Sequence, residues 1–446
     1  MHQLTHRMNT YLQAFNAYLY LLCYRFFTYW QHLHWSAQVL SIFALSRLWG
    51  WVIFSVIGAQ DKYTPWKTGP MSYAEFISIW DSGWYEKIAL DGYPRILPTN
   101  SEGIVAQNTW AFYPLYPMSV KFIQELTGSA YYPTAIALAT VSGFIASLVV
   151  YLLFNRSISW CRQHRLHLNN RSSRAVESPH HLALWATAAF AWAPVAPILQ
   201  VPYAEALNMV FLGLTLYLMM TQRWALGAIA GILAAFSRPV GVPLGALAGI
   251  WWLICMYRSY HQTPQAHPTV STLRGVLIKH LGQGVSAISI CAAAISWPLI
   301  AWAYTGRMDA YTATETAWRQ SHLVLFQPWI AQSQEYFGPA GVPVLIMSIL
   351  GFTFLMASRC ARRVLHPVLN LWCYSYLTYL LLFLYPQSST FRLLLPLFPL
   401  LVVFIGMSGS RAYRVLWIVA SAIFQSVWVG WLWHWKELPG GGDYPP

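Results

Sequence analysis

The feature that most constrains the fold of this chain is a series of long apolar runs, which recur from residue 36 to residue 433. Many of them are about 17–25 residues long, the length that a helix needs to cross a bilayer. Only 9% of the 446 residues are charged, whereas a soluble protein of this size needs roughly a quarter. The sequence therefore predicts an all-α polytopic membrane protein.

We expect about eleven membrane-spanning helices, at residues 36–58, 131–154, 182–199, 206–220, 224–236, 240–256, 281–302, 341–357, 368–385, 393–408 and 415–433. The fourth and fifth are short for full spans, which predicts helices that are tilted, broken or re-entrant. Two long connections, 59–130 and 303–340, are rich in aromatic residues, which favours folded loops. Residues 155–181 are basic and predict a cytoplasmic linker. We expect one integral membrane domain over residues 1–446, because no repeat is apparent.

The distribution of charge predicts the orientation. With residues 1–35 in the cytoplasm and no cleavable signal peptide, 16 of the 27 Lys and Arg residues fall in cytoplasmic segments and ten outside, with Arg47 inside the first span. This asymmetry agrees with the positive-inside rule, and it explains the net charge of +13 without a nucleic acid partner. Of the 14 acidic residues, only Glu177 lies on the cytoplasmic side. The acids therefore point to a function on the extracytoplasmic or lumenal face.

The stretch WDSGWYEKIALDGYP, residues 80–94, carries three acids among four aromatics. Its spacing predicts a short helix that ends in a turn at Asp91 and Gly92. Asp81 has two interpretations. Either it caps this helix, for which Ser82 is the other candidate, or it is a carboxylate at the mouth of a membrane cavity that acts as a general base on a hydroxyl.

At these residues the chain resembles a known family, the GPI mannosyltransferase II (PIG-V) family with its bacterial relatives, which are glycosyltransferases of the GT-C type. The resemblance covers residues 80–399. It is carried by WDSGWY at 80–85, AFYPLYP at 111–117, PYAEAL at 202–207, SRPVG at 237–241, AWRQ at 317–320 and FRLLLPLFP at 391–399. One departure is Leu393, where the relatives often have Tyr after the Arg.

The resemblance implies a GT-C-like helical bundle with a folded first extracytoplasmic loop. It also implies a polyprenyl- or dolichyl-phosphate hexose donor, mannose above all, and a glycan, glycolipid or protein hydroxyl as acceptor. Asp81 is then the catalytic base. Because the leaving group is an anion, cations must stabilise it, and Arg suits phosphate. We expect Arg238, Arg319 and Arg392 to bind that phosphate, with snorkelling to the interface as the alternative for Arg238 and Arg392.

The remaining candidate residues are expected to contact substrate: Trp80, Trp84, Tyr85, Asp91, Tyr203, Glu205, Trp318 and His322. For Glu205 the alternatives are a charge at a helix start and an ion-pair partner for Arg238. Asp91 is also read as a turn residue, and Asp309 and Glu315 are further candidates for acceptor contacts.

We expect no cofactor. A divalent cation between Asp81 and Glu205 is possible but not favoured, because hard cations need more oxygen ligands. No cysteine or histidine spacing indicates a metal site.

Two other classes of protein remain open. A transporter or flippase for a lipid-linked or anionic solute would keep its charges near mid-membrane and often shows repeats. An oligosaccharide polymerase or ligase uses similar substrates. An acid-rich outer loop with an aromatic-Asp pair favours the transferase.

Overall fold

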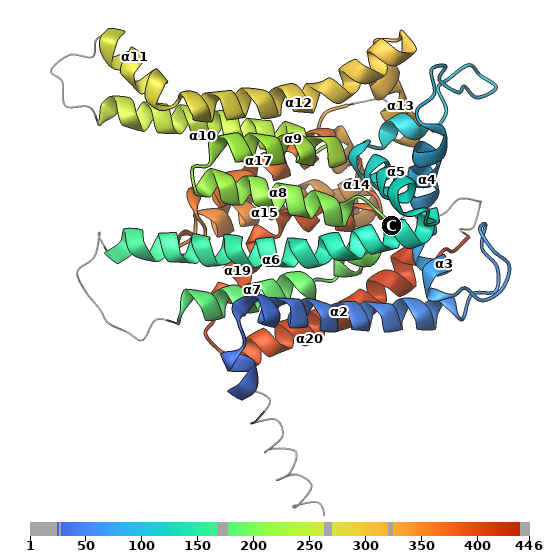
Figure 1. The fold of residues 1–446 in the computed structure, drawn as a ribbon, viewed down its shortest axis with the longest axis horizontal. Helices are drawn as coiled ribbons and strands as arrows, with labels where there is room; N and C mark the ends of the chain where they lie inside the picture. The colour runs from blue at the N-terminus through green and yellow to red at the C-terminus, as the bar shows by residue number, and fades with distance from the viewer. Residues whose placement is uncertain (1–24, 26–27, 167–176, 263–269, 320–323, 438–446) are drawn as a thin grey trace, which may run out of the picture.

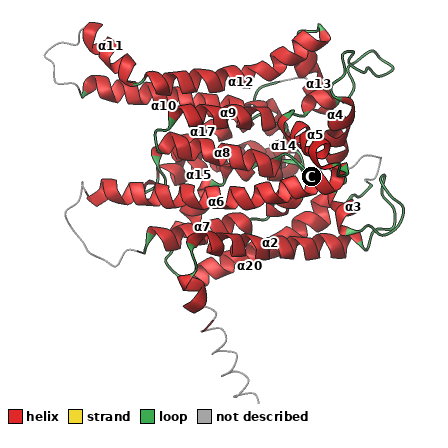
Figure 2. Cartoon of the chain, in the orientation of Figure 1, coloured by secondary structure: helices red, strands yellow, loops and turns green. Residues whose placement is uncertain are grey.

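The computed structural model describes residues 25, 28–166, 177–262, 270–319 and 324–437. Within these residues the chain is almost entirely helical, and two isolated β-bridges in the first long loop are its only extended pairings. Figure 2 shows the helices and the loops that join them. The predicted all-α class is therefore confirmed.

The main helices run side by side along the long axis of Figure 1. They are α2 (Trp35–Gly58), α6 (Tyr131–Leu166), α7 (Pro179–Ala191), α8 (Glu205–Met220), α9 (Trp224–Ser237), α10 (Gly241–His261), α12 (Leu281–Thr305), α15 (Gly341–Ala357), α17 (Pro367–Phe383), α19 (Pro399–Gly406) and α20 (Arg411–Trp428). Shorter elements are α3 (Tyr73–Ile77), α4 (Ser82–Asp91), η1 (Thr109–Ala111), α5 (Leu115–Thr127), η2 (Ala196–Gln200), α11 (Val270–Lys279), α13 (Ala310–Arg319), α14 (Gln327–Phe337), η3 (Gly338–Ala340), α16 (Ala361–Val364), α18 (Thr390–Leu393), η4 (Leu395–Leu397) and η5 (Val429–Trp433).

Six of the described helical segments are long and apolar enough to cross a membrane: α2, α6, α10, α12, α14 with α15, and α20 with η5. Outward-facing residues such as Ile288, Phe354 and Leu416 are mostly exposed, as expected of a surface that lipid covers. The expected count of about eleven spans is not confirmed. At 1.5 Å per residue, α8 and α9 rise only about 21–24 Å, although both are unbroken.

Two expected spans are broken by proline. The run at 182–199 ends as an α-helix at Ala191, before Pro194 and Pro197, and resumes as the 3₁₀ turn η2. Proline lacks the N–H that continues a helix. The run at 393–408 is divided in the same way, because prolines at 396 and 399 limit the regular helix there to α19. The spans expected at these two places are therefore not single continuous helices.

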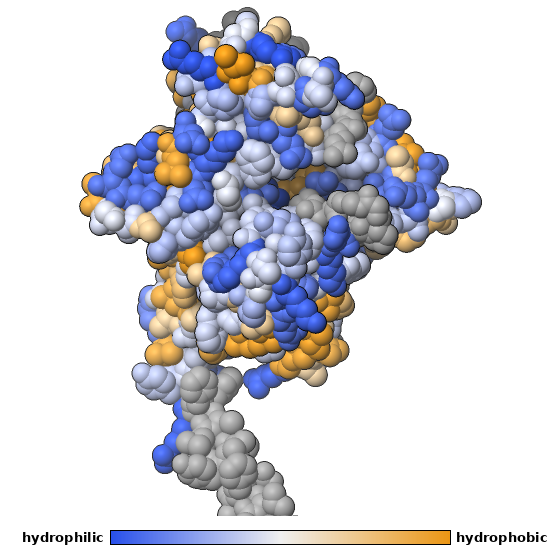
Figure 3. Space-filling model, turned by 90° about the vertical axis from the view of Figure 1, so that its right-hand side faces the viewer, coloured by the Kyte–Doolittle hydropathy of each residue, from blue (hydrophilic) through white to orange (hydrophobic). Residues whose placement is uncertain are grey.

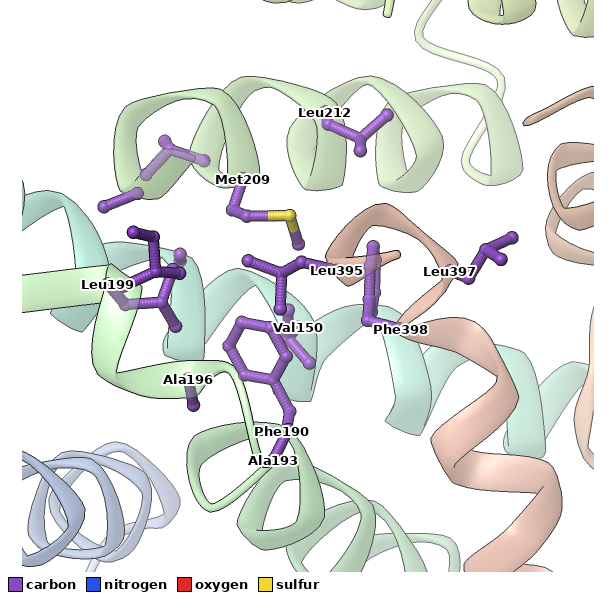
Figure 4. Packing of buried hydrophobic residues seen from close by; sticks show 14 of the residues in the cluster. Val150, Phe190, Ala193, Ala196, Leu199, Met209, Leu212, Leu395, Leu397 and Phe398 are labelled. Carbon is purple, nitrogen blue, oxygen red and sulfur yellow. The ribbon is translucent and has the colours of Figure 1, made fainter. Parts of the chain in front are cut away.

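The two breaks face each other inside the bundle. Phe190, at the end of α7, packs edge-on against Phe398, between η4 and α19, with ring centroids 5.9 Å apart. Figure 4 shows both residues with Met209 of α8 and Val150 of α6 in one buried cluster. Irregular backbone at membrane depth is tolerated only where protein surrounds it, and this packing provides that cover.

Arg47 of α2 satisfies the backbone that the first break exposes. Its guanidinium donates to the carbonyls of Ala196 and, at 3.0 Å, Ala191. Gln425 of α20 donates to the carbonyl of Ala193 between them, at 3.2 Å. Carbonyls without a helical partner are costly inside a membrane. Arg47, the charge inside the first expected span, therefore satisfies the backbone carbonyls that the break in the neighbouring helix exposes.

The linker expected at 155–181 begins as helix, because α6 continues to Leu166. Near its other end, Glu177 accepts two hydrogen bonds from Arg414, at 2.5 and 2.6 Å. Arg414 also donates to the carbonyl of Ser408. Glu177, the one acidic residue expected on the cytoplasmic side, is therefore an ion-pair partner of Arg414 at the start of α20.

Both long loops are folded, and their helices gather at one end of the bundle. Helices α3, α4 and α5 come from the first loop and α13 from the second, and all lie at the right of Figure 1. Viewed face-on in Figure 3, this end is largely hydrophilic and has a hollow near its middle. The structure describes helices in both loops, but α14, which was expected to belong to the second loop, forms one candidate membrane-spanning segment with α15.

Candidate active site

Asp81 directly precedes α4, but its side chain makes no capping hydrogen bond. Instead, one carboxylate oxygen accepts a hydrogen bond of 2.7 Å from Nη2 of Arg392. The Asp81 side chain is 14% exposed and that of Arg392 is 10% exposed. The interpretation of Asp81 as a helix cap is therefore wrong, and its carboxylate lies in a largely buried ion pair.

The backbone before Asp81 is unusual. Trp80 has a φ of 63°, in the left-handed region that bulky residues rarely adopt. Its indole N–H donates to the carbonyl of Trp433 at 2.8 Å. The Asp81 N–H donates to the hydroxyl of Tyr203, also at 2.8 Å, and that hydroxyl donates to the carbonyl of Ile79 at 3.2 Å.

Glu205 and Arg238 complete a cluster of four charges. Glu205, the first residue of α8, pairs with Nη1 of Arg238 at 2.5 Å and lies 3.6 Å from Nη1 of Arg392. Its side chain is only 5% exposed. Two carboxylates and two guanidiniums balance each other. Removing one member of such a buried group leaves its partner uncompensated, at a cost of about 3–5 kcal/mol.

The local fold explains why these charges meet. Arg238 follows the last turn of α9, which Asn208 of α8 holds by donating to Ser237 at 2.7 Å. Arg392 lies in α18, a single turn before the proline break. The N-terminus of α8 also favours the negative charge of Glu205. Of the interpretations of Glu205, the charge at a helix start and the ion-pair partner for Arg238 both agree with the structure.

The cluster lines a cavity of about 730 Å³. The predicted residues on its wall are Trp80, Asp81, Trp84, Tyr85, Glu205, Arg238, Trp318 and Arg392. Tyr203 is not among the described residues that line it and lies behind Asp81 and Arg392. Asp91 is exposed at the end of α4, away from the cavity. His322 and the side chain of Arg319 lie outside the described part of the chain.

Aromatic rings form much of the wall. Trp84, Phe112 and Trp318 contact one another with ring centroids 5.1–6.0 Å apart. Apolar residues of the cavity include Val242 and Pro298, on α10 and α12, and Val242 is 46% exposed. The cavity therefore combines a charged centre and an aromatic wall with an apolar side.

Sequence reasoning missed one face of α17. Tyr376, Tyr379 and Phe383 line the cavity at three- and four-residue spacing, which places them on one helix face. This spacing is visible in the sequence. An apolar helix contains many groups of residues at the same spacing, however, so the spacing alone does not identify these three. Glu315 of α13 also lines the cavity, whereas Asp309 is exposed and pairs with Arg307 at 2.8 Å.

The described residues contain no group of three or more His, Cys, Asp or Glu side chains arranged to hold a metal ion. In the cavity, the carboxylates of Asp81 and Glu205 are turned to arginines. The expectation that no divalent cation is required remains a prediction.

No family model matches the chain, and no curated protein matches it. Two solved structures from Archaeoglobus fulgidus align with 88% of the chain: the oligosaccharyltransferase AglB in complex with an inhibitory peptide and a dolichol-phosphate, and an oligosaccharyltransferase in the apo form. Each has 12% sequence identity and a TM-score of 0.43. The alignment covers 56% of each of those chains, so this protein matches little more than half of their length.

Proposed function

We propose that this protein is a membrane glycosyltransferase of the GT-C type, similar to the PIG-V family. In this proposal it transfers a hexose from a polyprenyl- or dolichyl-phosphate donor to a hydroxyl acceptor on the extracytoplasmic or lumenal face. Mannose is the first candidate for that hexose. The observation that carries this proposal is the single cavity in which Asp81, Glu205, Arg238 and Arg392 meet between aromatic walls. Its wall takes residues from both long loops, such as Trp84 and Trp318.

The proposed reaction is one in-line displacement. The acceptor oxygen bonds to the anomeric carbon while the bond from that carbon to the phosphate oxygen breaks, and the lipid phosphate leaves with the electron pair. The acceptor proton passes to the carboxylate of Asp81. A positioned base of this kind typically contributes about 10²–10⁴ in rate. A single displacement inverts the anomeric configuration.

The two arginines suit the leaving phosphate. Forked guanidiniums bind phosphate oxygens through paired, charge-assisted hydrogen bonds. In the structure these donors face Asp81 and Glu205. A phosphate that binds Arg392 competes with Asp81 for the same guanidinium. In this proposal, donor binding therefore releases the carboxylate that accepts the proton.

The walls fit the two parts of such a donor. Sugar rings stack on aromatic faces such as those of Trp84 and Trp318, which line the same cavity as the charges. The apolar side at Val242 and Pro298 suits an isoprenoid chain. A cavity with both surfaces supports a lipid-linked sugar over a free one.

The position of the charges favours an enzyme over a transporter. Transporters usually bind their solute near the bilayer midplane. Here the mid-span charge, Arg47, is engaged by backbone carbonyls. The charges that line a cavity, Asp81 and Arg392 among them, share its wall with residues of both long loops.

The test is transfer by the purified protein from labelled polyprenyl-phosphate mannose to a panel of glycan, glycolipid and peptide acceptors. We expect Asp81→Asn to lower turnover by about a hundredfold or more, because it removes the proton acceptor and keeps the shape. Asp91→Asn is the matched control and should be close to the parent. Near-parent turnover in folded Asp81→Asn would refute the base assignment, and no transfer by the parent from any lipid-phosphate sugar would refute the activity.

A further inference from the structure

The turn that presents Asp81 depends on support from outside itself. Trp80 is in the left-handed backbone region, with a φ of 63°, although it is neither glycine nor asparagine. Such a conformation persists only where the surrounding structure imposes it. The contacts of this turn therefore identify the residues that set the direction of the Asp81 side chain.

Tyr203 makes the contact that spans the turn. Its hydroxyl accepts the N–H of Asp81 at 2.8 Å and donates to the carbonyl of Ile79 at 3.2 Å. One oxygen atom thus joins the residues on either side of Trp80. The Tyr203 side chain is fully buried. A phenylalanine there would leave both backbone groups without this partner.

The same side chain contacts the other member of the ion pair. The guanidinium of Arg392 lies over the ring of Tyr203, 5.3 Å from its centroid. Two residues later, Glu205 pairs with Arg238 and approaches Arg392. The ring thus positions the cation, and the hydroxyl positions the backbone of the carboxylate that the cation binds.

We propose that Tyr203 is a positioning residue for Asp81, and that its hydroxyl holds Trp80 in the left-handed conformation that directs the Asp81 carboxylate into the cavity. This rests on the proposed function for the role of Asp81 as base. Tyr203 acts through Asp81, because it is not among the described residues that line the cavity. The sequence expectation that Tyr203 contacts substrate is replaced by this role.

The first test compares Tyr203→Phe with Tyr116→Phe. Tyr116 is equally buried, and its hydroxyl also donates to a backbone carbonyl, that of Ala135 at 2.9 Å. With labelled polyprenyl-phosphate mannose, Tyr203→Phe should lower kcat about ten- to a hundredfold, because small misplacements of catalytic groups cost that much. The KM for the donor should stay near that of the parent. Tyr116→Phe should leave kcat unchanged, and a parent-like kcat in Tyr203→Phe would overturn the proposal.

The second test changes the strained residue itself. Trp80→Gly and Trp80→Ala both lose the indole bond to Trp433, but only glycine adopts positive φ freely. Trp80→Gly should therefore turn over at least about fivefold faster than Trp80→Ala, and the gap should widen in the Tyr203→Phe background. Equal rates for the two would contradict the proposal, even if Tyr203→Phe alone does not fold.

A third measurement needs no substrate. Hydrogen exchange at the amide of Asp81 should be slow in the parent and in Tyr116→Phe, and faster in Tyr203→Phe, since the hydroxyl is its acceptor. Unchanged exchange would overturn the positioning role whatever the activity. If Asp81→Asn keeps parent turnover in the same assay, the proposed function fails. If Asp81→Asn is inactive and Tyr203→Phe is not impaired, only the positioning role fails.

Discussion

Arg392 contacts two of the acids that line the cavity, Asp81 and Glu205. It binds Asp81 at 2.7 Å, lies 3.6 Å from Glu205, and rests on the ring of Tyr203. No other described cation contacts both carboxylates. A planar guanidinium can direct separate donors at two acids and still stack on a ring, which an ammonium group cannot do.

We therefore expect Arg392→Lys to lower turnover by at least about tenfold, although the charge is kept, because lysine cannot serve both acids and the phosphate. Arg307→Lys is the matched control, since Arg307 forms an exposed pair with Asp309 that contributes little. The measurement is kcat with labelled polyprenyl-phosphate mannose. Equal activity of the two variants would show that Arg392 does not act through its forked geometry.

The residue types of the site were predictable, but their partners were not. Asp81 and Arg392 lie 311 positions apart, and Asp81 and Tyr203 are 122 apart. No local pattern encodes a contact over such distances, because the packing of the whole bundle decides it. The sequence therefore predicted three arginines that bind a phosphate. It did not predict that Arg238 and Arg392 are each paired with an acid.

At the scale of elements, some helix bounds followed the sequence closely, whereas α6 ends twelve residues after its expected end at 154 and α10 ends five residues after its expected end at 256. α2, α8 and α15 begin and end within one residue of their expected bounds. The apolar runs before and after Pro194 and Pro396 read as continuous, because hydropathy does not register a missing N–H. The partner that makes the first break tolerable, Arg47, belongs to another helix.

Arg47→Met should destabilise the protein by about 2–4 kcal/mol, because the carbonyls of Ala191 and Ala196 lose charge-assisted hydrogen bonds. Turnover per folded molecule should stay near that of the parent, since Arg47 does not line the cavity. Thermal unfolding in detergent, with Arg411→Met as an exposed control, measures the first effect. Unchanged unfolding, or lost turnover in fully folded protein, would contradict this structural role.

The capping box of α3 predicts that its contribution to the stability of the first loop depends on pH. The hydrogen bond from Lys67, then those from the backbone and hydroxyl of Ser72, lower the pKa of Glu75 from 4.5 to about 2. A lowered folded pKa means that the contribution is complete above about pH 4.5 and is lost as the pH falls toward 2. The unfolding temperature of the parent should exceed that of Glu75→Gln at pH 7, and the difference should shrink below pH 4.5. A difference that grows on acidification would exclude this assignment.

At the scale of the whole molecule, the two long loops meet at one end, and the cavity takes wall residues from both. Trp84 of the first loop and Trp318 of the second are in ring contact. Glu177 and Arg414 form their pair elsewhere, beside the start of α7. The two ends of the molecule therefore differ in their chemistry. The distribution of Lys and Arg predicts which of them faces the cytoplasm.

Labelling of single cysteines from outside intact cells tests this orientation. In a chain whose native cysteines are replaced by serine, Asn100→Cys should react with an impermeant maleimide and Asn170→Cys should react only after permeabilisation. The physical reason is the excess of Lys and Arg in segments such as 155–181. The reverse pattern would invert the orientation and place the cavity in the cytoplasm.

The four-charge cluster also has a consequence for the order in which the protein matures. Its members stand at 81, 205, 238 and 392, and a membrane chain is made and inserted from its amino terminus. Until Arg392 emerges, two carboxylates and one guanidinium leave one negative charge unmatched. The cavity is therefore among the last parts of the molecule to form, although Asp81 is translated early. A chain that stops before α18 holds every helix of the first loop and still has no finished site.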